Sequence, residues 1–143
     1  MTQPPSPASF ETCRLPAEPD AVAPDGSQVR VLLRRAGGSM AHFELPAGHT
    51  SRAVMHPALE EIWFFVDGRG EMWRHDGTTD QVVAVEPGTC VTIPAGTRFQ
   101  FRAAADAPLA AVGVTMPPWP GDDAAVAVSG PWRPGDQQGS GNR

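Results

Sequence analysis

The stretch GHTSRAVMHPALEEIWFFVDG, residues 48–68, carries the strongest fold signal in the sequence. Within it, residues 61–67 (EIWFFVD) predict a strand, and because side chains alternate between its faces, Glu61, Trp63 and Phe65 share the face that we expect to point inward. Residues 51–56 (SRAVMH) predict a second strand that ends with His56. Both polar side chains fall on the inward faces of these strands, so we expect them to meet in one apolar interior.

Short apolar runs of the same kind continue along the chain and are separated by turn-forming residues such as AGG, DGRG, EPG and PAG. No helical periodicity is sustained over three turns. Nine strands spaced about ten residues apart are typical of an all-β sandwich or barrel. These predicted strands cover residues 28–35, 39–45, 51–56, 61–67, 70–76, 80–86, 89–94, 97–103 and 109–116.

The two ends of the chain differ from this central part. We expect residues 1–25 to form a loose N-terminal segment, with an edge strand around residues 10–15. Residues 26–117 are expected to form the barrel. Residues 118–143 are rich in Pro and Gly, and we expect Trp119 and Trp132 to pin this segment to the barrel while its last eight residues are disordered.

The composition excludes several classes of function. The chain has 143 residues and a net charge of -5, with 16 acids, 11 arginines and no lysine. An acidic chain without basic clusters argues against a nucleic-acid partner and against an anionic membrane surface. Without Lys there is no Schiff-base chemistry, and without Tyr there is no phenolic acid or base. The preference for Arg over Lys, with much Ala, Pro and Gly, is typical of a bacterial protein.

The cellular location is predicted from the same sequence. We expect a cytoplasmic protein, because no apolar run has the length of a membrane helix and the N-terminus lacks the pattern of a secretory signal. The two cysteines, Cys13 and Cys90, are then expected to be free thiols, with Cys90 inside an apolar strand.

Two spaced patterns identify a family that the chain resembles. They read Gly48-x5-Val54-x-His56-x4-Glu61-x6-Gly68 and Gly88-x5-Pro94-x-Gly96-x2-Phe99. Their spacings are those of the two motifs of the cupins, which are small all-β proteins. The resemblance covers residues 38–116 and implies a single jelly-roll barrel of two antiparallel sheets. The glycines are then expected at chain reversals, where a residue without a side chain adopts positive φ without strain.

The resemblance also implies where a metal ion would be held. Cupins usually bind a transition metal through four side chains, which correspond here to Val54, His56, Glu61 and Phe99. Two of the four are apolar, and tight sites usually need at least three protein ligands. A divalent ion such as Fe, Mn, Zn or Ni would therefore need a further ligand, for which His49 is the candidate.

Three functions remain open at this point. The leading one is a barrel that binds a small organic molecule and transfers protons through a His56–Glu61 pair, as an isomerase, cyclase or dehydratase, without a tightly held metal. Arg52 is then expected to clamp an anionic group. The apolar walls of this pocket are expected to be Val54, Trp63, Phe65, Phe99 and Phe101.

The first alternative is a metal-dependent oxygenase or isomerase that uses His56, Glu61 and His49. The second is a non-catalytic cupin with a structural role as a dimer. In each case the resemblance implies a homodimer, which would form through an outer sheet and an exchanged N-terminal segment within residues 10–35.

Overall fold

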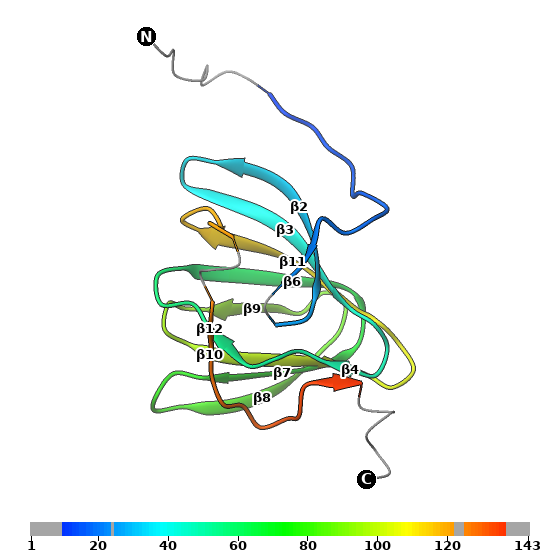
Figure 1. Cartoon of the computed structure of the whole chain (residues 1–143), viewed down its shortest axis with the longest axis vertical. Helices are drawn as coiled ribbons and strands as arrows, with labels where there is room; N and C mark the ends of the chain where they lie inside the picture. Colours follow the sequence, from blue (N-terminus) through cyan, green and yellow to red (C-terminus); the bar gives the residue numbers. More distant parts are fainter. Residues whose placement is uncertain (1–9, 24, 122–124, 137–143) are drawn as a thin grey trace.

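Two antiparallel sheets packed against each other form the body of the molecule (Figure 1). The computed structural model describes residues 10–23, 25–121 and 125–136, and all regular structure in these ranges is β-strand. Hence the described residues include no helix that is long and apolar enough to span a membrane. The six-stranded sheet has, in spatial order, β1 (Ala21–Val22), β2 (Gln28–Arg35), β3 (Gly38–Leu45), β11 (Leu109–Met116), β6 (Glu60–Gly68) and β9 (Cys90–Ile93).

The seven-stranded sheet is centred on one strand that has neighbours on both sides. One edge of β10 pairs with β7, and β7 pairs with β8; the other edge of β10 pairs with β4 and β5, which continue to β13 and β12. The bounds are β4 (His49–Thr50), β5 (Val54–Met55), β7 (Gly70–His75), β8 (Asp80–Val85), β10 (Arg98–Ala103), β12 (Val126–Ala127) and β13 (Gly135–Asp136). The prediction of an all-β jelly roll with two antiparallel sheets is confirmed.

The predicted strands agree with the observed ones to within one residue at each end, with two exceptions. Of the predicted run 51–56, Val54–Met55 forms β5, whereas β4 covers the two residues before the run, so the pairing with β10 is interrupted between these strands. Between them, the Ser51 hydroxyl accepts the Phe101 amide at 3.0 Å, and the Arg52 amide donates to the Asp25 carbonyl at 2.6 Å. These bonds replace part of the regular ladder, so the strand is interrupted by a contact with Asp25, a residue distant in the sequence.

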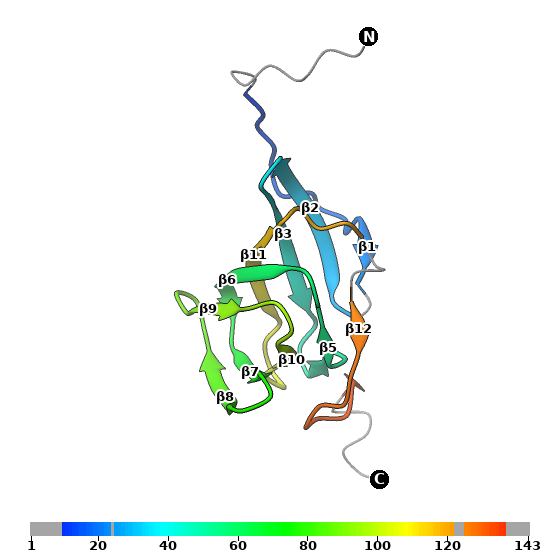
Figure 2. The ribbon, with the colours of Figure 1, turned by 90° about the vertical axis from the view of Figure 1, so that its left-hand side faces the viewer.

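The predicted edge strand at residues 10–15 is the second exception and is wrong. These residues form no strand, and Phe10 is 94% exposed. The first short strand is instead β1, which pairs with β2. Figure 2 shows β1 on the same side of the molecule as β12, although one strand comes early in the chain and the other late. The expected disorder of the last eight residues falls almost wholly outside the described residues.

The core lies between the two sheets and follows the alternation of the strands. In β6, every second residue from Glu61 to Phe65 is buried, while Ile62 and Phe64 are exposed. Cys90 lies on the outer face of β9, so it is exposed rather than buried, and both Cys13 and Cys90 are free. The largest fully buried side chains are Trp63, Phe65, Phe99, Phe101, Leu45, Met72, Ile93 and Leu109.

One motif glycine is required by the packing as well as by its backbone. Gly68 ends β6 with a φ of 76°, and a Cβ atom there would overlap the carbonyl group of Pro108. Only glycine combines this positive φ with so close an approach of a neighbouring backbone. The first motif therefore fixes the corner between β6 and β7.

A buried amide attaches the C-terminal strap, which we define as residues 125–136. Gln100 is fully buried on the face of β10 that points away from the core. Its Nε2 donates to the Trp132 carbonyl at 2.8 Å and to the Ser51 carbonyl at 2.8 Å, and its Oε1 accepts the Trp132 amide at 3.2 Å. The Trp132 ring also lies 4.0 Å from the Arg102 guanidinium carbon. The prediction that Trp132 pins this segment is confirmed.

Replacing Gln100 by Leu is expected to release the strap while the barrel stays folded. The variant leaves the Trp132 amide and two carbonyls without this partner, and each unsatisfied buried group costs about 1–3 kcal/mol. We expect amide hydrogen exchange at Trp132 to accelerate at least about tenfold. The exposed Gln81→Leu substitution on β8 is the matched control. Equal exchange rates in the two variants would show that Gln100 does not hold the strap.

Candidate functional site

His56 and Glu61 lie next to each other in the barrel interior. His56 follows β5, and Glu61 is the second residue of β6, directed inward by the alternation of that strand. The His56 Nε2 atom is 3.6 Å from Glu61 Oε2, and the two side chains are 12% and 2% exposed. The Phe99 ring lies along the imidazole at a centroid distance of 6.1 Å. The structure therefore brings the two polar residues together in an aromatic interior.

The second oxygen of the Glu61 carboxyl group is fixed by Trp63. The indole Nε1 donates to Glu61 Oε1 at 2.8 Å. The indole in turn stacks on Phe43 at 4.7 Å, and both rings lie against Gly113 of β11, where a Cβ atom would come within 3 Å of them. Gly113 was not expected to contribute to the site, because its role depends on a neighbouring strand rather than on any turn signal.

Burial changes the acidity of Glu61. The loss of hydration disfavours the charged carboxylate and raises the pKa of Glu61 to about 7, although the Trp63 hydrogen bond lowers it in part. The nearby Asp25 carboxyl raises the pKa of Glu61 further. Near neutral pH both protonation states of Glu61 are therefore populated, which suits a group that gives and takes protons.

Asp25 is a second buried acid at this site and was not among the predicted site residues. Its Oδ1 accepts the Ser27 hydroxyl at 2.6 Å and the Ser27 amide at 2.8 Å. Burial raises the pKa of Asp25 above its ordinary value, while these two hydrogen bonds lower it. The surrounding letters, PDGS, read as an ordinary turn, so no local signal distinguishes this acid from a surface one.

The space between these groups is small and largely enclosed. The cavity has a volume of about 20 Å³, which holds one water molecule but no organic ligand. Its covering residues come from both chain ends, Ala23 and Asp25 from one and Trp119 and Ala125 from the other. The full lining consists of Ala23, Asp25, Phe43, Val54, His56, Glu61, Trp63, Phe99, Thr115, Trp119 and Ala125.

Several residues expected at the site lie elsewhere. Arg52 is exposed and does not line the cavity, because the strand break at Ser51 turns its backbone toward Asp25. Phe65 and Phe101 are buried in the core but are not in the cavity wall. Of the predicted walls, Val54, Trp63 and Phe99 do line the cavity.

The third predicted metal ligand also lies away from the other two. His49 belongs to β4, and its Nδ1 is 3.3 Å from the Ala47 carbonyl oxygen. Within residues 10–23, 25–121 and 125–136, no three His, Cys, Asp or Glu side chains are grouped so that they could hold a metal ion. The set His56, Glu61 and His49 is therefore not assembled, and the donors present do not fit a tightly bound transition metal.

A hollow of about 560 Å³ on the described surface is a different one and has no wall residue in common with the cavity. Its two arginines are already paired: Arg69 with Asp106 at 2.6 Å, and Arg102 with Glu71 at 2.6 Å. Because this hollow brings no acid–base pair into a buried setting, the site candidate remains the smaller cavity.

The sequence and the fold now identify the family. A family model described as "Cupin domain" matches residues 41–115, more than half of the 143 residues. The chain belongs to the cupin family. As a cupin, it has Val54 and Phe99 at two positions where related proteins usually have metal ligands. No protein with a curated function matches this cupin significantly by sequence.

Solved structures with the same fold include proteins of different kinds. This cupin is 20% identical to BH2720 from Bacillus halodurans, with a TM-score of 0.59, covering 70% of this chain and 74% of that one. It is 16% identical to KdgF from Halomonas sp. (TM-score 0.58; 68% and 84% covered). It is 15% identical to the oxalate decarboxylase of Bacillus subtilis, which has Mn(II) centres (TM-score 0.62; 78% and 30% covered). At these identities the likeness concerns the fold alone.

Proposed function

We propose that this cupin binds a small organic molecule in the barrel and catalyses proton transfer with His56 and Glu61, without a tightly held metal ion. The observation that carries the proposal is the buried pair with Nε2 and Oε2 3.6 Å apart in an aromatic interior. Such a pair stabilises a barrel less than apolar residues of similar volume would, so a purely structural role does not account for it.

The two groups suit opposite roles in an isomerisation. Neutral His56 accepts a proton from a substrate carbon next to a carbonyl group, and protonated Glu61 gives its proton to the carbonyl oxygen, which yields the enol isomer. A proton shift from His56 to Glu61 then restores the starting state. The substrate keeps its composition, and no electron acceptor is needed. Trp63 keeps the Glu61 carboxyl group oriented throughout, through the 2.8 Å hydrogen bond.

Binding requires a change at the cover of the cavity. A volume of about 20 Å³ is far below the roughly 300–1,000 Å³ of ordinary ligand pockets. The strands on the cavity wall are tied into sheets, whereas Trp119 lies beyond the end of β11 and Ala125 precedes β12. We therefore expect the segments that carry Trp119 and Ala125 to move aside when a ligand enters.

The test measures the exchange of carbon-bound hydrogen with deuterium in D₂O, followed by NMR, for a panel of small 1,3-dicarbonyl compounds and hydroxyketones. We expect the protein to accelerate exchange in at least one class, and His56→Leu to reduce that acceleration about 100-fold or more. The His75→Leu variant, at a half-buried position of β7 outside the cavity, is not expected to change it. Two results would favour a structural cupin. In the first, every compound exchanges at the rate seen in buffer alone. In the second, His56→Leu keeps the full exchange activity and has a higher melting temperature.

A further inference from the structure

A second hollow lies directly beside the cavity and opens to the outside. It has a volume of about 250 Å³. Phe43, Thr115 and Trp119 line both this groove and the small cavity, so the two spaces adjoin at these three residues. Its remaining wall is made of Val31, Arg34, Ser39, Met40, Ala41, Pro120 and Gly121. We call this hollow the entry groove.

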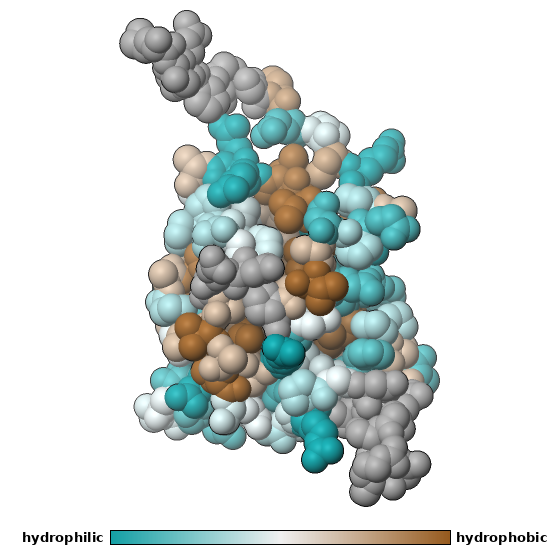
Figure 3. Space-filling view, in the orientation of Figure 1, coloured by the Kyte–Doolittle hydropathy of each residue, from teal (hydrophilic) through white to brown (hydrophobic). Residues whose placement is uncertain are grey.

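The groove exists because one sheet extends further than the other. Figure 1 shows the β2–β3 hairpin projecting beyond the strands of the seven-stranded sheet, so its apolar residues are incompletely covered. Val31 and Met40 are 42% and 41% exposed. In the space-filling view, hydrophobic surface reaches the solvent in the upper half of the molecule, where β2 and β3 lie (Figure 3). This apolar surface favours binding of an apolar group.

A short hydrogen-bond relay joins the Trp119 backbone, in the wall between the groove and the cavity, to β3 and β11, and its bond to Trp119 has to break when the Trp119 segment moves aside. Ser39 Oγ lies 2.8 Å from Thr115 Oγ1 and accepts the Trp119 amide at 2.9 Å. The hydroxyl groups on the groove floor are therefore already used by the protein. Thus they offer little to a polar ligand, and Trp119 stands between groove and cavity.

Among the described residues that line the groove, Arg34 is the one that carries a charge. Within residues 10–23, 25–121 and 125–136 its guanidinium group makes no hydrogen bond or ion pair. A groove with apolar walls and one available cation matches a ligand with an apolar body and one anionic end, since a guanidinium group binds a carboxylate with two parallel hydrogen bonds.

We propose that the entry groove is the outer part of the binding site and holds the apolar body of a small carboxylate whose anionic end pairs with Arg34. The volume of about 250 Å³ limits this body to roughly the size of one aromatic ring with a short chain. The other end of the ligand then faces Trp119 and, behind it, Glu61. That a ligand occupies the groove does not depend on the proposed function. That its other end faces Glu61 to react there does rest on the proposed function.

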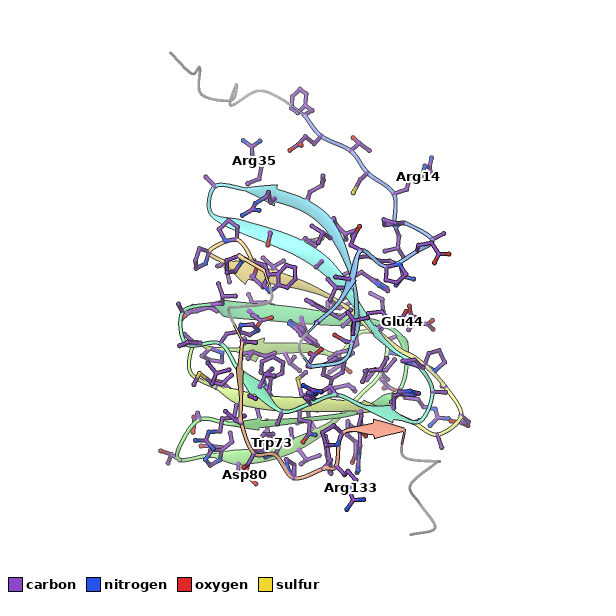
Figure 4. The ribbon with its side chains drawn as sticks, in the orientation of Figure 1. Arg14, Arg35, Glu44, Trp73, Asp80 and Arg133 are labelled. Carbon is purple, nitrogen blue, oxygen red and sulfur yellow. The ribbon has the colours of Figure 1, made fainter. Side chains whose placement is uncertain are left out.

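The test uses three probes of one shape on the full chain: 3-phenylpropionate, the neutral 3-phenylpropanol and the cationic 3-phenylpropylamine. Binding is followed by NMR shifts of the Phe43 and Trp119 rings. We expect the carboxylate to bind most tightly and Arg34→Gln to weaken it about five- to tenfold, with the alcohol unchanged within twofold. Arg35→Gln is the matched control, because Arg35 lies at the tip of the same hairpin and outside the groove (Figure 4).

The possible outcomes separate this inference from the proposed function. Three results would overturn the inference. The carboxylate and the amine bind with equal affinity, no probe binds at 10 mM (about the weak limit of such measurements), or Arg34→Gln and Arg35→Gln lose equal affinity for the carboxylate. A change of oligomeric state in Val31→Glu without any effect on probe binding would assign the groove to a second copy of the chain instead. Glu61→Gln is expected to keep groove binding, so a loss of proton exchange with intact binding concerns only the chemistry.

Discussion

Histidine at positions 54 and 99 is expected to convert this cupin into a metal-binding protein. Val54 and Phe99 are directly opposite each other on β5 and β10, and both line the cavity that contains His56 and Glu61. The double variant Val54→His/Phe99→His therefore presents three imidazoles and one carboxylate to a single point. Four such donors satisfy a tetrahedral Zn²⁺ or an octahedral Ni²⁺ that keeps open positions.

The measurement is the melting temperature with and without about 1 mM ZnCl₂ or NiCl₂. A site occupied at about 1,000 times its dissociation constant stabilises the native state by about 4 kcal/mol, which corresponds to roughly 10 °C for a domain of this size. We expect this shift in the double variant and a shift of less than about 1 °C in the natural protein.

The control for this result is the same variant with Glu61→Gln added, which removes the carboxylate donor and is expected to remove most of the shift. An equal shift in the natural protein would contradict the conclusion that its donors do not fit a metal ion. It would mean that other side chains complete a site around His56 and Glu61.

Glu61→Gln is expected to make the protein more stable at alkaline pH and to flatten the dependence of its stability on pH. The pKa of Glu61 is raised from 4.5 in the unfolded chain to about 7 in the folded one. Between these values the folded state binds a proton that the unfolded state lacks, so the free energy of unfolding falls as pH rises from about 4.5 to 7. The loss is nearly complete by about pH 8 and amounts to about 3 kcal/mol.

Glutamine avoids this loss because it has no charge to bury and still accepts the Trp63 hydrogen bond. Denaturant unfolding at pH 5, 6, 7 and 8 is the measurement. The variant should match the natural protein near pH 5 and exceed it by about 2 kcal/mol at pH 8. Glu60→Gln, one residue away but exposed, is expected to leave the pH profile unchanged. Parallel profiles for the natural protein and Glu61→Gln would mean that Glu61 is ionised when buried.

The predictions that succeeded rest on local rules. Alternation within residues 61–67 placed Glu61 and Trp63 inside and left Ile62 exposed, because neighbouring side chains on a strand point to opposite faces. Spaced glycines indicated where the chain turns, as at Gly68, because residues other than glycine rarely adopt a positive φ. These rules depend on neighbours a few residues away, which the sequence displays directly.

The predictions that failed depend on partners distant in sequence. Arg52 was expected to face the pocket by the parity of an unbroken strand, but a bond to the Asp25 carbonyl breaks that strand. The role of Gln100, which clamps Trp132 from the outer face, depends on a segment about 30 residues away. Likewise, Trp73 of β7 is buried, and its Nε1 donates to Asp80 Oδ1 of β8 at 2.7 Å (Figure 4).

The sequence by itself therefore determined the family, the two sheets, and the pairing of His56 with Glu61 in an apolar interior. Only the tertiary structure decided that Asp25 shares that interior, that His49 lies outside it, and that both chain ends close the cavity. Strand periodicity and turn chemistry are properties of short segments. The composition of a site instead depends on which loops cover the barrel, and that is set by side-chain and backbone contacts between segments far apart in the chain.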